Sequence, residues 1–157
     1  MSDTRVFISH RQSDSARAKS WADFLKRNSI DCYLDTLDPT PQQLAGRAVS
    51  KYLHRQLQAC THLLVIFTKN TDGSMWVPFE IGISTERDIG IAIDLTTSIR
   101  DLPEYLLEWP VLENDASHQA FLEQLRRAYT VRDTTKSQGR RYSDQFHESL
   151  KRAIGQP

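Results

Sequence analysis

Residues 62–68 constrain the fold of this chain more than any other segment. They read HLLVIFT, and the apolar side chains follow one another without the polar alternation of a strand that has one face in water. A continuous apolar run of this length indicates a strand buried on both faces. Such a strand needs helices above and below it, which is the arrangement of a mainly parallel sheet.

Strand patterns and helix patterns alternate along the chain on both sides of this run. Further strands are predicted at residues 6–8, 31–35 and 90–95, with a short edge strand at 109–112. Helices are predicted at residues 13–27, 41–59, 74–88, 115–128 and 142–154. Strands that alternate with helices form right-handed crossover units, so the sequence predicts an α/β fold with a mainly parallel sheet.

The length of 157 residues fits a single domain better than two. We expect its core at about residues 5–128, followed by a C-terminal loop and helix at 129–157. Within that last part, residues 131–141 are polar and basic without helical periodicity, and they predict a mobile loop.

Charge and composition exclude several classes of protein. Twenty basic residues balance twenty acidic ones, so nothing predicts a nucleic-acid partner. Two isolated cysteines are too few for a structural zinc site, and no metal is expected. The N-terminus shows no apolar signal region, and the longest apolar run is too short to span a bilayer. We therefore expect a cytoplasmic protein without a membrane partner.

Open parallel sheets bind ligands beyond the carboxyl ends of their strands. This rule selects residues 9–11, 35–40, 68–76 and 95–99 as the segments in which to look for a site. They contain no glycine-rich dinucleotide fingerprint, no phosphate-binding loop that ends in Gly-Lys-Ser/Thr, and no Gly-x-Ser-x-Gly elbow. The usual nucleotide-binding and hydrolase motifs are therefore not supported.

The segment SMWVPFE at residues 74–80 contains the strongest candidate for chemistry. Trp76 and Glu80 are four residues apart, so on a helix they share one face. A carboxylate beside an indole can face the oxocarbenium ion that forms when an N-glycosidic bond breaks, and the ring offers a flat surface for a base or ribose. The alternative is structural: a glutamate in the first turn of a helix is commonly solvated, and a tryptophan commonly belongs to the core.

Four motifs in order resemble the TIR domain family over about residues 5–125. They are VFISH at 6–10, a helix that begins near Asp14, YLD at 33–35, and Ser-x-Trp-x-x-x-Glu at 74–80 after a buried strand. The resemblance implies a flavodoxin-like, three-layer fold with about five strands. Enzymatic members of the family use the glutamate to release nicotinamide from NAD⁺, and then hydrolyse or cyclise the ADP-ribose.

Carried over to this chain, the resemblance implies that Glu80 is the catalytic carboxylate. It implies that the substrate-binding residues are Ser9, His10, Arg11, Asp35, Ser74 and Trp76. Loop 36–41 would match the family's mobile loop, which serves self-association and gates the site.

The resulting hypothesis is an NAD⁺ glycohydrolase or ADP-ribose cyclase that signals in bacterial antiviral defence. NAD⁺ is its substrate, no cofactor is expected, and a separate effector protein would read the nucleotide product. Two alternatives stay open: a non-catalytic TIR–TIR adaptor that uses the loop after residue 35, and an enzyme similar to nucleoside deoxyribosyltransferases.

Overall fold

The computed structural model describes residues 3–36, 47–71, 73 and 76–157, with the backbone alone at 35–36 and 47–50. Its strands are β1 (Arg5–His10), β2 (Asp31–Thr36), β3 (His62–Phe67), β4 (Gly90–Leu95) and β5 (Val111–Leu112). In this part of the chain they form one five-stranded sheet in the order β2-β1-β3-β4-β5, and every pairing is parallel. This is the flavodoxin-like strand order, so the predicted fold class is confirmed.

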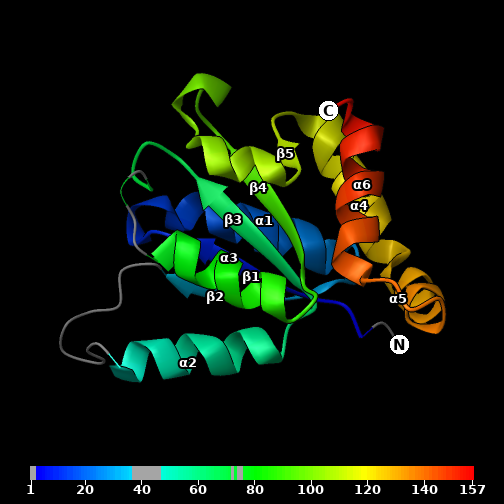
Figure 1. Ribbon diagram of the computed structural model, residues 1–157. Helices are drawn as coiled ribbons and strands as arrows, with labels where there is room; N and C mark the ends of the chain where they lie inside the picture. Colours follow the sequence, from blue (N-terminus) through cyan, green and yellow to red (C-terminus); the bar gives the residue numbers. More distant parts are fainter. Residues whose placement is uncertain (1–2, 37–46, 72, 74–75) are drawn as a thin grey trace.

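Helices cover both faces of this sheet (Figure 1). The α-helices are α1 (Ser15–Arg27), α2 (Arg47–Gln58), α3 (Trp76–Glu86), α4 (Asp115–Arg126), α5 (Ala128–Ser137) and α6 (Tyr142–Ile154). Single 3-10 turns are η1 (Gln12–Asp14), η2 (Ile99–Asp101) and η3 (Glu104–Glu108). Among the described residues, no helix combines the length and the apolarity that crossing a membrane requires.

Side-chain alternation along the strands divides the core into two layers. Val6 and Ile8 of β1 belong to the layer that packs against α1, α4 and α6, whereas Phe7 belongs to the layer under α2 and α3. Strand β3 contributes to both layers, and all of its residues are buried. The prediction that residues 62–68 contain a strand buried on both faces is therefore confirmed.

The prediction of a mobile loop at residues 131–141 is wrong for its first half. Helix α5 occupies Ala128–Ser137 and packs against α6. Its inner side consists of Ala128 and Thr135, which are buried, with the half-buried Val131 between them. These positions follow helical spacing, but a stripe formed by one alanine, one valine and one threonine is too weak to stand out among polar neighbours.

The N-terminus of α6 is capped by a side chain from another part of the chain. Asp88, in the turn between α3 and β4, accepts hydrogen bonds from the backbone N–H groups of Tyr142 (2.9 Å) and Ser143 (2.7 Å). These groups have no acceptor within their own helix, because the first turn of any helix leaves its N–H groups unpaired. Asp88 therefore fixes where α6 begins.

Two further side chains of the C-terminal segment replace sheet hydrogen bonds. His147 Nε2 accepts a bond of 2.8 Å from the backbone N–H of Ile91 in β4. Gln156 Oε1 accepts one of 2.7 Å from the N–H of Val111 in β5. Strand β5 has only two residues, so it leaves the start of β4 without a strand partner on that side, and His147 fills this position.

Glycine 90 lets α6 approach the sheet closely. A Cβ atom at this position would lie 2.8 Å from Cδ1 of Phe146 and 2.9 Å from Cδ2 of His62. Both side chains are buried. A residue larger than glycine at position 90 would therefore push α6 away from the sheet.

Candidate functional site

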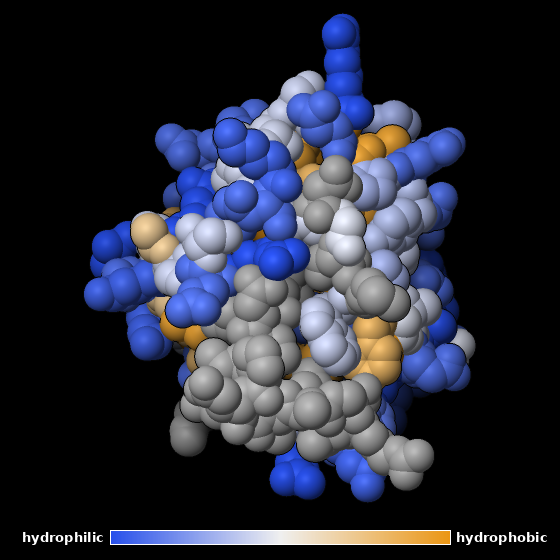
Figure 2. All heavy atoms as spheres, turned by 90° about the vertical axis from the view of Figure 1, so that its left-hand side faces the viewer, coloured by the Kyte–Doolittle hydropathy of each residue, from blue (hydrophilic) through white to orange (hydrophobic). Residues whose placement is uncertain are grey.

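The carboxyl ends of the strands form the side of the molecule shown in Figure 2, where the described side chains are mainly hydrophilic. Strands β1 and β3 are neighbours and end here, and α3 begins here after the turn that follows β3. The parallel order therefore brings residues from the first strand beside residues that follow the third.

Glu80 of α3 and Ser9 of β1 form the central contact of this site. The Ser9 hydroxyl donates a hydrogen bond of 2.5 Å to Glu80 Oε2 across 71 residues of sequence. This length lies at the short end of the range for O–H···O hydrogen bonds. Neither side chain has any exposed surface. Glu80 lies on the sheet-facing side of α3 together with Val77 and Ile81, which the helical spacing places beside it.

Trp76 is the first residue of α3, one turn before Glu80. Its side chain is half-buried, and its ring packs edge-on against Phe79 with 5.8 Å between the ring centroids. The tryptophan therefore stands at the end of the helix that faces the rim, and Glu80 lies deeper. This is the relative placement that the four-residue spacing predicts.

The side chains of His10 and Ser9 leave β1 on opposite faces of the sheet. The alternation of β1 places Ser9 with Phe7, toward α3, and places His10 with Ile8, toward α1. His10 is buried, and its Nδ1 lies 3.4 Å from the carbonyl oxygen of Ile8. Arg11 follows the strand directly and is half-buried. The side chain of Asp35, all of Ser74 and most of loop 36–41 lie outside the described residues.

The carboxylate of Asp14 connects the segment after β1 with the turn after β3. The sequence does not predict this tertiary contact. Asp14, at the start of α1, makes no capping bond to its own helix. It accepts instead from Thr68 Oγ1 at 2.9 Å and from Asn70 Nδ2 at 3.1 Å, partners 54 and 56 residues away. Its acidic position before a helix predicts a cap, and no local pattern indicates the tertiary role.

The turn after β3 is closed by its own side chains. Thr71 Oγ1 accepts a bond of 3.0 Å from the N–H of Thr68 and donates one of 3.1 Å to the carbonyl of Ile66. Thr68 Oγ1 in turn accepts from the N–H of Asn70. Together with Asp14, these bonds fix the start of the connection that leads to α3.

The sequence of this chain matches a known protein family. The model of the TIR domain matches residues 6–125 of this chain. The chain belongs to the TIR domain family. The match includes all of the sheet except Arg5, and the helix that carries Trp76 and Glu80, whereas α5 and α6 lie beyond it.

One curated relative is similar over part of its length. It is a probable 3′ cyclic ADP-D-ribose synthase, ThsB′, of Bacillus cereus strain MSX-D12, with 27% identity over 81 residues. The matched part is 49% of this TIR chain and 41% of that protein, so the two share less than half of their lengths.

Two solved structures were also found to be similar. A diflavin flavoprotein A3 from Nostoc sp. superimposes with a TM-score of 0.47 at 13% identity, over 66% of each chain. The TIR domains of the activated Roq1 resistosome, which directly recognises the pathogen effector XopQ, give 0.43 at 15% identity, over 97% of this chain and 84% of theirs. Both TM-scores are below 0.5, and the fold assignment rests on the strand order given above.

A second buried carboxylate of the TIR domain has a structural role. Asp94 of β4 lies on the face toward α1 and α4, and Arg17 donates two bonds of 2.8 Å to it. His118 Nε2 approaches to 3.4 Å. Burial acts to raise the pKa of Asp94, but the hydrogen bonds from Arg17 and the nearby His118 outweigh it and the pKa is lowered. This carboxylate ties two helices to the sheet, on the face away from Glu80.

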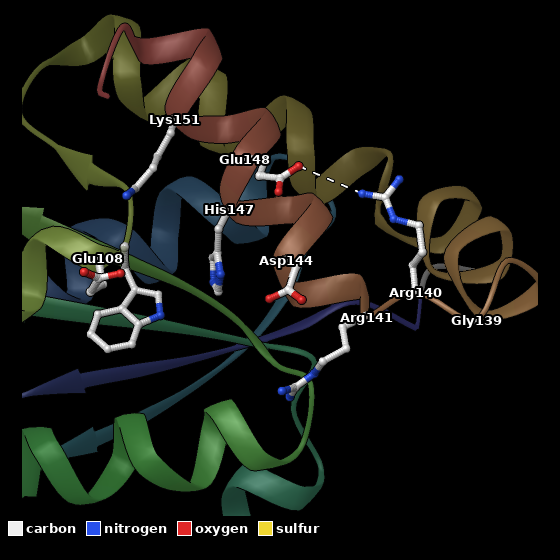
Figure 3. A pocket seen from close by; sticks show the side chains of 9 residues that line it. Glu108, Gly139, Arg140, Arg141, Asp144, His147, Glu148 and Lys151 are labelled. Carbon is white, nitrogen blue, oxygen red and sulfur yellow. Dashed lines mark ion pairs between the residues drawn. The ribbon is translucent and has the colours of Figure 1, made fainter.

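A depression of about 640 Å³ lies beside α6, next to the start of β4 and therefore at the opposite end of the sheet (Figure 3). Its basic side chains have partners within the domain: Arg140 pairs with Glu148 at 4.0 Å, and Lys151 donates to the carbonyl of Leu107. His147 lines it too, although its position on a helix predicts exposure. This depression shares no residue with the Ser9–Glu80 contact.

Proposed function

We propose that this TIR domain cleaves the bond between nicotinamide and ribose in NAD⁺, with Glu80 as the catalytic carboxylate. The observation that carries the proposal is the contact between Glu80 and Ser9 at the carboxyl ends of the strands, one helical turn from Trp76. Open parallel sheets bind their ligands at this edge. The similarity to a probable cyclic ADP-ribose synthase supports the same chemistry.

The proposed reaction needs one negative charge in a water-poor place. When the glycosidic bond breaks, nicotinamide leaves with the bonding electron pair as a neutral molecule, and the positive charge passes to C1′ of the ribose. A buried carboxylate stabilises this oxocarbenium ion more strongly than a solvated one would. Glu80 therefore lowers the barrier to bond cleavage, and the half-buried indole of Trp76 packs against the ring system of the substrate.

The second half of the reaction decides the product. Water that adds to C1′ and releases a proton gives ADP-ribose, whereas attack by a hydroxyl group of the same molecule gives a cyclic ADP-ribose. The name of the curated relative favours the cyclic product. In this proposal NAD⁺ is the substrate, loop 36–41 mediates self-association, and a separate effector responds to the nucleotide in antiviral defence.

One observation favours a second function, a non-catalytic TIR–TIR interaction module. The side chain of Glu80 has no exposed surface, so NAD⁺ reaches the carboxylate only after a movement that uncovers it. In an adaptor no such movement is needed, and the Ser9–Glu80 contact would serve packing alone.

The two functions differ in a single measurement, the release of free nicotinamide from NAD⁺ by the purified protein. Glu80→Gln keeps the size of the side chain and removes its charge, so we expect nicotinamide release to fall by about a hundredfold or more with the fold intact. Glu86→Gln is the matched control, since Glu86 lies exposed near the end of the same helix and should leave the rate unchanged.

Two results would contradict the proposal. If Glu80→Gln turns over NAD⁺ at the wild-type rate, Glu80 is not the catalytic group. If the wild-type protein releases no nicotinamide across a wide range of protein concentrations, the adaptor function is the better account.

A further inference from the structure

The hydrogen bond between Ser9 and Glu80 assigns a specific task to Ser9. We infer that Ser9 is a positioning residue: its hydroxyl holds the carboxylate of Glu80 in the orientation that faces C1′ of the ribose, and it does not itself contact NAD⁺. This inference rests on the proposed function, since it names the group that prepares Glu80 for its reaction.

The donor is fixed by the sheet. Ser9 belongs to β1, which pairs with β2 on one side and with β3 on the other, and its register partner in β3 is Val65. A central strand with two neighbours is among the most rigid parts of such a fold. The serine side chain is short, with a single torsion angle between its backbone and the oxygen, so the strand leaves Oγ only the few staggered positions of that torsion.

The acceptor, the carboxylate of Glu80, is more mobile than the serine hydroxyl and depends on this hydrogen bond for a fixed orientation. A glutamate side chain has three rotatable bonds, and a carboxylate that rotates presents different oxygen lone pairs to its surroundings. The bond of 2.5 Å holds Oε2 beside Ser9 Oγ and so restricts the rotation of the carboxylate. Preorganised charge stabilises a developing ion without reorganising during the reaction, which is the main source of such electrostatic catalysis.

The same bond argues against a direct contact between Ser9 and the substrate. A serine hydroxyl has one proton to donate, and Ser9 donates it to Glu80. Neither Ser9 nor Glu80 has any exposed surface, so in this arrangement the movement that uncovers the carboxylate leaves the serine covered. NAD⁺ therefore meets the carboxylate, with the serine behind it.

Three substitutions at position 9 test the inference through the kinetics of nicotinamide release. Ser9→Ala removes the donor, and we expect kcat to fall about ten- to a hundredfold with the KM for NAD⁺ nearly unchanged. Ser9→Thr keeps the hydroxyl and should restore most of kcat. Ser9→Cys, a weak donor of similar size, should lie between Ser9→Ala and the wild type.

Ser84→Ala is the matched control. Ser84 lies on α3 one turn after Glu80, is fully buried, and has no hydrogen-bond partner for its hydroxyl among the described residues. Removing this second buried hydroxyl should leave kcat unchanged. A Ser9→Ala variant with wild-type kcat, or one that loses activity only through KM, would overturn the inference.

A double-mutant cycle on stability tests the contact without any assay of activity. Ser9→Ala should lower the urea midpoint of the wild-type protein but not that of a Glu80→Met variant, in which the acceptor is absent. Equal shifts in the two backgrounds would show that the bond does not hold in solution. A wild-type protein that releases no nicotinamide refutes the proposed function, while this cycle still decides whether Ser9 holds Glu80.

Discussion

At the scale of single residues, a substitution of Trp76 distinguishes a role in the candidate site from a role in the hydrophobic core. Its ring is only half-buried and packs against Phe79 at the start of α3. We expect Trp76→Ala to reduce nicotinamide release strongly while lowering the free energy of unfolding by less than about 3 kcal/mol, because a fully buried tryptophan typically costs 3–5 kcal/mol on truncation. Kinetics and urea denaturation of the same preparation measure both effects.

Trp21 provides the comparison for this substitution. It is almost fully buried and packs against Phe24 and Phe121, so Trp21→Ala should show the full loss of roughly 3–5 kcal/mol. If Trp76→Ala destabilises the protein as much as Trp21→Ala does, Trp76 belongs to the core and its predicted place in the site is wrong.

The candidate site could be predicted from the sequence only where its geometry is local. Trp76 and Glu80 share a helix, so their spacing alone places one a turn from the other. The bond from Ser9 joins positions 71 residues apart, and the strand-end rule indicated the neighbourhood but not the contact. The opposite direction of His10 follows from alternation in β1, which the motif VFISH by itself does not fix.

At the scale of elements, Asp14 holds the turn after β3 against the start of α1. We expect Asp14→Ala to lower the free energy of unfolding by about 1–3 kcal/mol, because Thr68 and Asn70 lose a shared acceptor in a largely buried place. Nicotinamide release should fall as well, since this turn leads into α3.

Hydrogen exchange locates the effect of that substitution. The N–H of Asn70, which donates to Thr68 Oγ1, should exchange faster in Asp14→Ala, whereas amides of α6 should not change. Asp23→Ala, at an exposed position of α1, is the control and should be close to neutral. If amides throughout the domain exchanged faster to the same extent, Asp14 would not act locally on the turn after β3.

Some elements could be predicted from the sequence and others could not, for physical reasons. The edge strand β5 was predicted from WPVL because proline is tolerated at a sheet edge, and it was found at Val111–Leu112. Helix α5 was missed because its inner stripe is short and weakly apolar. The start predicted for the helix at residues 41–59 lies outside the described residues.

At the scale of the whole molecule, the buried His62 and the partly buried His147 make the fold sensitive to acid. Burial lowers the pKa of His62 to about 3, and burial together with the nearby charge of Lys151 lowers that of His147 to about 4. His147 accepts a bond through Nε2 and must stay neutral to do so. In the unfolded chain both groups titrate near pH 6.5, so protonation favours unfolding.

The stabilisation from these histidines is complete above pH 6.5 and is lost as the pH falls from 6.5 toward 4. For His147 the difference is on the order of 3 kcal/mol. Urea midpoints measured across this range should therefore fall steeply. His147→Gln, which keeps an acceptor oxygen and cannot titrate, should show a smaller fall. Asp94 and Asp88, whose pKa values are lowered below the ordinary value of 3.8, lose their stabilisation progressively below about pH 5 and add to the fall only near the acid end of this range. A flat profile between pH 6.5 and 4 would contradict the account.

The close approach at Gly90 has a consequence for the evolution of this protein. Gly90 lies inside the region that the TIR domain model matches, whereas Phe146, which occupies the space above it, lies beyond that region. A side chain at position 90 would therefore need a smaller residue at position 146 or a shift of α6. Relatives that keep glycine at position 90 and an aromatic residue at 146 should therefore inherit the α6 packing as one unit. A relative with a bulkier residue at position 90 is expected to attach its own C-terminal segment differently.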